Sequence, residues 1–519
     1  MLLYLKQTAR YKKINIFKSF ARQKPFSMEE KIEKKPSTAR RDRLIELEKQ
    51  AQTLWAASNF FEANPSENPL KYFLTFPYPY VNGKLHLGHA FSMTKCEFTA
   101  RYKRLMGYNV LFPFSFHCTG MPISASAQRL KDEYEKYGEK PIPEKEGEKT
   151  TQYSILKSSG VPETEIKKFV DPLYWLKYFP PVGKTDLISF GGAIDWRRSF
   201  ITTSMNPYYN SLIEWQFTKL KEQNLIVFGK RPSIYSIKDK QMIADHDRSE
   251  GEGVGPQEYT LIKLRVLEPF PPALAKLEGH KVFLVAATLR PETMYGQTNC
   301  FILPTGVYGA FLMKKDEVFV CSERSAWNMA HQNLTKVPEQ VTKIVDIIGQ
   351  DLIGLPLKAP LATFEKVYSL PMMTISMGKG TGVVTSVPSD APDDFAALRD
   401  LQKKEEMRKK FKVTEEMVIP YNPVPIINIP EYGDFAALKA CDDFKIQSQN
   451  DKELLIKAKE KVYLKGFYEG VMLVGSCKGK KVFESKNIVK KEMIDNGDAE
   501  IYYEPESNVV ARSGGIFIF

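Results

Sequence analysis

The feature that most constrains the fold is a strand, loop, helix and strand pattern in the first part of the chain. Lys71 to Phe76 is a short apolar and aromatic run typical of a strand. Apolar residues between Leu87 and Met106 recur mainly at three-, four- and seven-residue steps, which predicts an amphipathic helix ending at Gly107. Asn109 to Phe116 is apolar again. This order predicts the opening of a parallel α/β sheet.

The loop of this pattern carries its chemistry. It contains two histidines three residues apart, in the segment Pro77-Tyr-Pro-Tyr-Val-Asn-Gly-Lys-Leu-His-Leu-Gly-His89. At a helix N-terminus, free N–H groups and the helix dipole favour an anion. We expect His86 and His89 to donate hydrogen bonds to nucleotide phosphate oxygens, and Gly88 to let a flat adenine approach the backbone. The alternative is a packed helix start with two exposed histidines.

A second candidate segment is Thr288-Leu-Arg-Pro-Glu-Thr-Met-Tyr-Gly296, directly after an apolar run from Val282 to Ala287. Threonine hydroxyls at a strand end can contact a bound ester and its water, and Arg290 offers a fork for phosphate or carboxylate. A turn with capping threonines explains the same residues, so this segment alone favours the structural interpretation.

A third segment, Gly378 to Asp394, joins a glycine-rich approach, a short apolar strand and clustered acids. Acids after a strand can hold an amino group as its cation, and glycines permit close backbone approach. The glycines do not form a phosphate loop, because no Gly-Lys-Ser/Thr ending follows and the next element is a strand.

The chain length and the Gly- and Pro-rich stretches predict several domains, because 519 residues are more than one hydrophobic core usually accommodates. Gly251-Glu-Gly-Val-Gly-Pro256 marks a boundary, and β-type runs dominate from Glu258 to about Glu504. The runs are Tyr259 to Val266, Lys281 to Ala287, Glu317 to Cys321, Thr374 to Met377 and Val383 to Val387. Before the first folded part, a helix is expected across Asp42 to Ala57.

Charge is concentrated at the N-terminus. Residues 1–27 hold seven lysines and arginines and no acid, within a chain of net charge +12. This segment is either a mitochondrial presequence or a disordered tail of an over-extended gene model. The pI of about 9.0 suits a nucleic-acid partner. Six widely spaced cysteines indicate neither a disulfide framework nor a zinc site, and no apolar run is long enough to span a bilayer.

The histidine segment resembles the first signature of the class I aminoacyl-tRNA synthetases. Phe76 to Ala90, followed by Phe116-His-Cys-Thr-Gly-Met-Pro122, is similar to the leucyl-tRNA synthetases of the eukaryotic and archaeal type. Residues 288–296 and 378–394 resemble the hydrolytic editing domain inserted in the leucyl, isoleucyl and valyl enzymes. The implied fold is α/β, a Rossmann-like catalytic core interrupted by a β-rich α/β editing domain.

The resemblance implies four parts. Residues 1–40 form a basic extension and linker, 41–254 the first half of the catalytic domain, 255–505 the editing domain, and 506–519 the start of the second catalytic half. The Lys-Met-Ser-Lys-Ser loop and the anticodon-binding domain of the family are missing from this sequence, so we expect a truncated chain.

Residue roles follow from the resemblance. Phe76 and Tyr78 would line a leucine pocket with His117 at its polar end, while His86, Gly88 and His89 would bind ATP, which brings Mg²⁺. In the editing domain, Asp394 would anchor the α-amino group, and Thr288 would position water and ester. Arg290 would contact the substrate, and Thr293 would exclude leucine. Asp390 and Asp393 are expected to be solvated loop carboxylates.

The implied activity is ATP-dependent joining of leucine to tRNA(Leu), with hydrolysis of misacylated tRNA. A cytoplasmic location and, as a candidate partner, a multi-synthetase complex accompany it. Two alternatives stay open at this point: a chain that retains only the deacylase activity, and a non-catalytic regulator that binds leucine or ATP.

Overall fold

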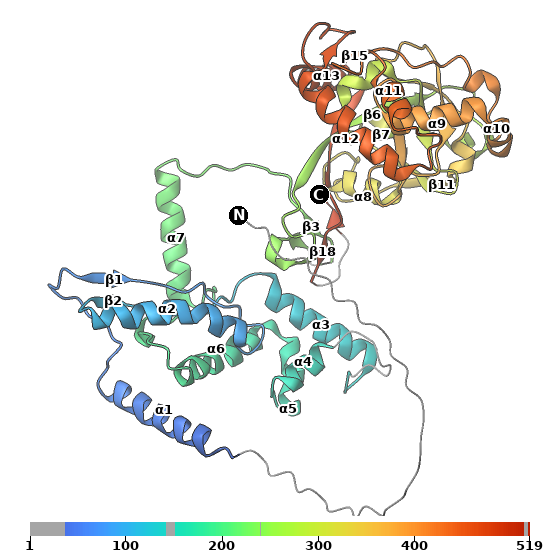
Figure 1. Cartoon of the computed structure of the whole chain (residues 1–519). Helices are drawn as coiled ribbons and strands as arrows, with labels where there is room; N and C mark the ends of the chain where they lie inside the picture. Colours follow the sequence, from blue (N-terminus) through green and yellow to red (C-terminus); the bar gives the residue numbers. More distant parts are fainter. Residues whose placement is uncertain (1–36, 142–150, 239, 513–516, 519) are drawn as a thin grey trace, which may run out of the picture.

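A computed structural model of the chain describes residues 37–141, 151–238, 240–512 and 517–518. Figure 1 shows two lobes, a mainly helical one from the first half of the chain and a β-rich one from the second half. The basic segment 1–27, with its two alternative interpretations, lies outside the described residues. None of the helices in the described ranges has both the length and the hydropathy needed to cross a membrane.

The helical lobe is built around a strand–helix–strand unit. Strands β1 (Lys71–Phe73) and β2 (Asn109–Leu111) pair in parallel, and helix α2 (Leu87–Leu105) connects them. The predicted order is confirmed, although both strands are shorter than expected. Beyond β2 the chain continues extended, and Phe116 bridges Ile201.

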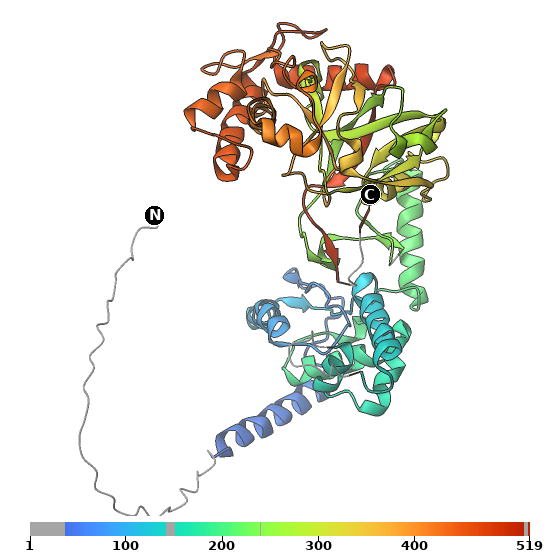
Figure 2. The same ribbon diagram turned by 90° about the vertical axis from the view of Figure 1, so that its right-hand side faces the viewer.

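The remaining helices of this lobe precede and follow the unit in the chain. They are α1 (Ala39–Ala57), α3 (Met121–Tyr137), α4 (Gln152–Ser158), α5 (Glu163–Ile166), α6 (Pro172–Ser189) and α7 (Pro207–Glu222). The predicted helix over Asp42 to Ala57 is confirmed as α1, which extends away from the lobe (Figure 2). The core of the lobe is strongly aromatic, with Phe112 and Phe114 after β2 packed in one cluster with Trp175 and Phe179 of α6.

Helix α2 has its apolar stripe on the outside. Phe91 and Phe98 are 71% and 68% exposed, whereas Met93 and Ala100 are buried against the lobe. The periodicity therefore predicted the helix correctly, while the face turned to the core is a different one, made of Met93, Glu97 and Ala100.

The β-rich lobe contains one large mixed sheet. Its strands are β6 (Pro256–Val266), β7 (Lys281–Thr288), β8 (Asn299–Ile302), β9 (Val307–Leu312), β10 (Glu317–Cys321), β11 (Lys343–Ile348), β12 (Pro356–Lys358), β13 (Val367–Pro371), β14 (Val383–Ser386) and β17 (Ala499–Pro505). The order is β11-β9-β10-β7-β6-β12-β13-β8-β14, and β17 pairs with β6. The middle of each of the two central strands is buried, over residues 259–264 of β6 and 282–286 of β7, which explains the apolar run of β7.

Helices cover this sheet, contrary to the prediction that strands dominate from 258 to 504. Residues 392–495 form mainly helices: α9 (Pro392–Lys403), α10 (Glu405–Phe411), α11 (Ala436–Asp443), α12 (Lys452–Glu469) and α13 (Val482–Asp495). An earlier helix is α8 (Glu323–His331), and a small sheet pairs β15 (Ile427–Asn428) with β16 (Val471–Met472). The strand predicted at Thr374 to Met377 is wrong, because this stretch is a turn-rich segment at the wall of a cavity.

Short strands lie between the lobes. They are β3 (Tyr235–Ser236), β4 (Gln241–Met242), β5 (Arg248–Glu250), β18 (Val510–Ala511) and β19 (Phe517–Ile518). Strand β18 pairs with β5, and β19 pairs with β3, so the outgoing and returning chain segments run side by side between the lobes (Figures 1 and 2).

Candidate functional sites

Two histidines cap helix α2. The Nδ1 atom of His86 accepts a hydrogen bond from the Gly88 N–H at 3.1 Å, and the Nδ1 atom of His89 accepts from the His86 N–H at 3.3 Å. The two rings lie 4.1 Å apart. Each histidine therefore satisfies an N–H group that the start of a helix would otherwise leave unpaired.

This capping fixes the ring tautomers. A neutral imidazole that accepts at Nδ1 carries its proton at Nε2, so both rings present an Nε2–H donor away from the cap. Burial, with a smaller contribution from His86, lowers the pKa of His89 and favours this neutral form. The helix start thus combines two side-chain donors with a positive dipole end, the arrangement expected for a phosphate site.

Gly88 also makes room for a neighbouring side chain, and the expected approach of an adenine stays a prediction. A Cβ atom at this position would lie 2.9 Å from His86 Cε1. The room beside the glycine backbone is therefore used by the His86 ring, and a side chain at 88 would displace the first histidine.

A cavity of about 580 Å³ lies against the helix start. Its lining includes Phe76, Tyr78, Tyr80, His86 and His89. Phe76 stacks on Phe114 with a centroid distance of 5.7 Å, and the Tyr78 ring contacts Phe200 at 5.7 Å. Predicted pocket residues and predicted ATP residues therefore face one space.

His117 is not among the residues that line this cavity. Its ring lies 4.4 Å from the ring of Tyr80, which does line it, and its Nδ1 atom is 3.2 Å from Thr202 Oγ1. His117 thus contacts a residue that lines the cavity without lining it itself.

A second cavity, of about 560 Å³, lies in the β-rich lobe. It opens between the end of β7 and strand β14, and its lining includes Thr288, Arg290, Thr293 and Asp394. These four residues come from the two segments that the sequence singled out. The structure brings them together.

The threonines of this cavity have defined hydrogen bonds. Thr288 Oγ1 accepts from the Arg290 N–H at 3.1 Å, and Thr293 Oγ1 donates to the Arg290 carbonyl at 2.8 Å. The turn interpretation is therefore confirmed, and the site interpretation of the same residues stays a prediction. Because the Thr293 hydroxyl is used within the turn, its contribution to the cavity is bulk.

Asp394 is a buried carboxylate in the cavity wall. It is 8% exposed and accepts a hydrogen bond from the Val387 N–H at 2.8 Å. Burial raises its pKa to about 7, and neighbouring Asp393 adds to the shift, while the Val387 hydrogen bond, Lys459 and Arg290 oppose it. A carboxylate held in this way gains strongly from a cation placed beside it.

Two lining residues were missed by sequence reasoning. Lys459 and Tyr463 lie one turn apart on α12 and both line the cavity. Lys459 forms an ion pair with Asp393, and the Arg290 guanidinium lies 4.7 Å from the centre of the Tyr463 ring. No motif surrounds them; a helix packed over the cavity supplies them.

The prediction that Asp390 and Asp393 are solvated loop carboxylates is wrong. Asp390 is fully buried, accepts from Ser389 Oγ at 2.6 Å, and burial raises its pKa to about 6. Asp393 lies in the first turn of α9, paired with Lys459. For Asp393 the physical reason is its place at the start of α9 beside Lys459 of α12, a packing that the sequence did not reveal.

Metal ligands do not cluster in the described ranges, where no three His, Cys, Asp or Glu side chains are grouped to hold an ion.

Sequence comparison now gives the class of protein. The model of the family described as tRNA synthetases class I (I, L, M and V) matches residues 50–346, more than half of the chain. The chain belongs to this family, and both the predicted resemblance and the α/β fold class are confirmed.

Several individual proteins are similar to this chain over most of its length. The cytoplasmic leucine–tRNA ligases of Pongo abelii and Arabidopsis thaliana are each 50% identical over 92% of this chain, and that of Saccharomyces cerevisiae is 42% identical. The chain spans about half the length of these relatives, between 44% and 48%. Among solved structures, the editing domain of the Plasmodium falciparum cytosolic leucyl-tRNA synthetase is 30% identical over 48% of this chain and all of its own, with a TM-score of 0.44.

Proposed function

We propose that the chain carries the amino-acid-activating site and the proofreading site of a leucine–tRNA ligase. Its substrates would be leucine, ATP with Mg²⁺, and tRNA(Leu), in the cytoplasm. The observation that carries the proposal is the convergence of Thr288, Thr293 and Asp394 on one cavity, with the carboxylate buried. The names of the relatives support leucine as the amino acid.

The proposed division of the chain follows the two cavities. Residues 41–254 would be the first half of the catalytic domain, and residues 255–505 an inserted editing domain. The separate apolar cores of the two lobes support this division. Residues 1–40 as an extension, residues 506–519 as the return to the catalytic half, and the multi-synthetase complex stay predictions.

Proofreading is hydrolysis of the ester that joins an amino acid to the terminal ribose. Asp394 binds the α-ammonium group of the esterified amino acid as a charge-assisted hydrogen bond. Water adds to the ester carbonyl, the ribose oxygen leaves and takes a proton, and free amino acid and tRNA result. Thr288 orients ester and water through its hydroxyl. Anchoring of the ammonium holds the carbonyl at the attack position.

Selectivity is steric. One methyl or methylene distinguishes leucine from norvaline or isoleucine, which an apolar pocket discriminates by only about 10- to 200-fold. Thr293, 3% exposed, is a fixed wall of the hydrolytic cavity. It excludes the γ-branched side chain of leucine and admits smaller or differently branched ones, so that correct product escapes hydrolysis.

Activation uses the other cavity. Phe76 and Tyr78 bind the leucine side chain, and the leucine carboxylate attacks the α-phosphorus of ATP, with pyrophosphate leaving. The Nε2–H donors of His86 and His89 stabilise charge on the phosphate oxygens during this step. Mg²⁺ enters with ATP and neutralises its phosphates.

Hydrolysis of purified norvalyl-tRNA(Leu) by the 519-residue chain tests the proposal, with Asp394→Ala as the matched inactive variant. We expect turnover by the parent and none by the variant. Equal rates would overturn the assignment of the cavity. Pyrophosphate exchange into ATP with leucine tests the activating site separately.

A further inference from the structure

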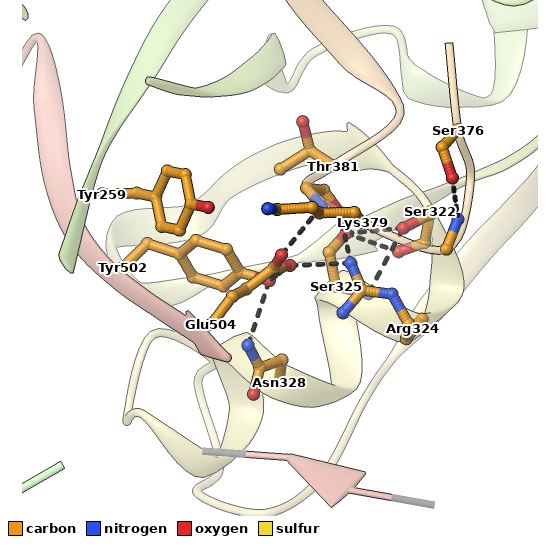
Figure 3. Close-up of polar contacts among 12 residues, drawn as sticks. Tyr259, Ser322, Arg324, Ser325, Asn328, Ser376, Lys379, Thr381, Tyr502 and Glu504 are labelled. Atoms are coloured by element: carbon orange, nitrogen blue, oxygen red, sulfur yellow. Dashed lines mark hydrogen bonds and ion pairs between the residues drawn. The ribbon is translucent and has the colours of Figure 1, made fainter. Parts of the chain in front are cut away.

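A buried carboxylate at the end of strand β17 contacts a residue in the wall of the hydrolytic cavity without lining the cavity itself. Glu504 is 1% exposed, and its Oε2 atom accepts from the Gly380 N–H at 2.8 Å. Its Oε1 atom accepts from Arg324 Nη2 at 2.7 Å and from the Tyr502 hydroxyl at 2.5 Å. Figure 3 shows the carboxylate between these side chains and the glycine segment. Both carboxylate oxygens are therefore in use.

Arg324 of α8 completes a clamp on the same glycine. Its Nη2 atom also donates to the Gly380 carbonyl at 2.6 Å. The N–H and the carbonyl of Gly380 are thus held by two oppositely charged side chains that also pair with each other. Tyr502 keeps its proton for Glu504, since burial and Glu504 raise its pKa, and Asn328 donates to its hydroxyl at 3.1 Å.

The clamped segment belongs to the cavity. Lys379, Gly380, Thr381 and Gly382 line the same space as Asp394. Gly380 and Gly382 have φ angles of +65° and +82°, in the left-handed region that glycine adopts without strain. Two such glycines make a deformable wall, which needs external contacts to keep one shape.

The strand that bears the clamp also leads to the other lobe. After β17 the chain continues to β18, which pairs with β5 between the lobes. Lys379 adds a second contact to this returning segment, donating to the Glu506 carbonyl at 2.9 Å.

We propose that Glu504 and Arg324 are positioning residues for proofreading: together they hold the glycine segment 378–382 as a wall of the hydrolytic cavity and join that wall to the strand returning to the catalytic lobe. This inference rests on the proposed hydrolytic function.

Three variants of the 519-residue chain test it. Glu504→Gln replaces one of the two accepting oxygens with an NH₂ group. This NH₂ group then faces a hydrogen-bond donor, and Arg324 loses its anionic partner. Glu504→Gln with Arg324→Met removes both charges, which restores stability because no unpaired charge stays buried. Glu500→Gln is the control, a glutamate of the same strand that pairs with Lys315 near the surface.

The variants should affect the melting temperature and the hydrolysis of norvalyl-tRNA(Leu) differently. We expect Glu504→Gln to lower both, with kcat/KM about 10- to 100-fold below the parent, the scale of a displaced site. The double variant should regain the melting temperature while hydrolysis stays low, and Glu500→Gln should match the parent. Recovery of hydrolysis together with stability would overturn the positioning role.

Amide exchange gives a readout independent of activity. The segment 378–382 should exchange faster in both Glu504 variants, and unchanged exchange would contradict the clamp. If the parent protein does not hydrolyse the ester, the proposed function is wrong. If the parent hydrolyses it, Asp394→Ala is inactive and the double variant is fully active, then only this inference is wrong.

Discussion

Pro256 and Pro505 are register partners at the outer ends of β6 and β17. The chain therefore enters and leaves the β-rich lobe at neighbouring points, the geometry that tolerates insertion of a domain. The buried residues of its three apolar clusters all lie between Tyr259 and Tyr502. We predict that residues 256–505, expressed alone, unfold in one cooperative transition.

Calorimetry and limited proteolysis check this prediction. A single heat-absorption peak and a protease-resistant core are expected. A broad, non-cooperative melt with complete digestion would show that the lobe depends on the rest of the chain.

Substitution of Thr293 should change which ester is cleaved. Thr293→Ala removes bulk from the cavity wall and should make the protein hydrolyse correctly charged leucyl-tRNA(Leu). Thr293→Val keeps the volume and loses only the hydrogen bond to the Arg290 carbonyl, so it should still spare leucyl-tRNA. Hydrolysis assays with both esters decide, and equal behaviour of the two variants would contradict a steric role.

Hydrolysis should follow the ionisation of Asp394. The carboxylate must be charged to bind the substrate ammonium, and its pKa is about 7 in the empty cavity. We expect kcat/KM to fall about tenfold per pH unit below this value, and to fall again above about pH 8, where the substrate amine loses its proton. A flat profile between pH 5 and 7 would exclude this carboxylate as the anchor.

The raised pKa of Asp394 also predicts that its ionisation, which hydrolysis needs, lowers the stability of the folded protein. Because the folded state holds the Asp394 proton to higher pH than the ordinary value of 3.8, the free energy of unfolding falls as pH rises between these values. Asp394→Asn should therefore stabilise the empty protein at pH 8, by up to about 4 kcal/mol. At pH 4 most of that gain should be gone. Denaturant melts of parent and variant at both pH values measure the difference, and equal stability at pH 8 would contradict the buried charge.

The helix-cap role of His86 can be separated from phosphate binding. His86→Ala should cost helix α2 about 1 kcal/mol and lower pyrophosphate exchange by about two orders of magnitude. His86→Asn should restore the cap but not the exchange, because asparagine is a good N-cap that cannot place a donor where Nε2 lies. Pyrophosphate exchange, with deacylation of norvalyl-tRNA(Leu) as the control activity, tests this. Loss of both activities would mean that the histidine holds the fold.

Local patterns predicted what depends on local physics. Strands β7 and β10 were expected almost to the residue, since buried strands show continuous apolar runs. Thr288 and Asp394 were expected in one site because their segments resemble the editing domain of the leucyl, isoleucyl and valyl enzymes, and both residues line one cavity.

The site residues that the sequence did not predict owe their positions to the packing of helices and strands that are distant in the chain. Lys459 and Tyr463 lie on a helix whose apolar residues are spread around its surface, so nothing in α12 marks the face turned to the cavity. Asp390 looks like a loop acid in sequence, and the structure buries it completely beside Ser389, whose hydroxyl donates to it. The clamp between Glu504 and Arg324 joins residues 180 positions apart, a separation that no local sequence pattern covers.

The mutual capping of His86 and His89 makes the start of α2 sensitive to acid. Each ring accepts a backbone N–H through Nδ1, and a proton added there would set two donors against each other. Burial and the neighbouring His86 lower the pKa of His89, which favours the neutral ring that caps the helix. Protonation at Nδ1 would break the cap and leave the Nε2–H donor in place. Acid would therefore disturb the first turn of the helix before it removed any donor for phosphate.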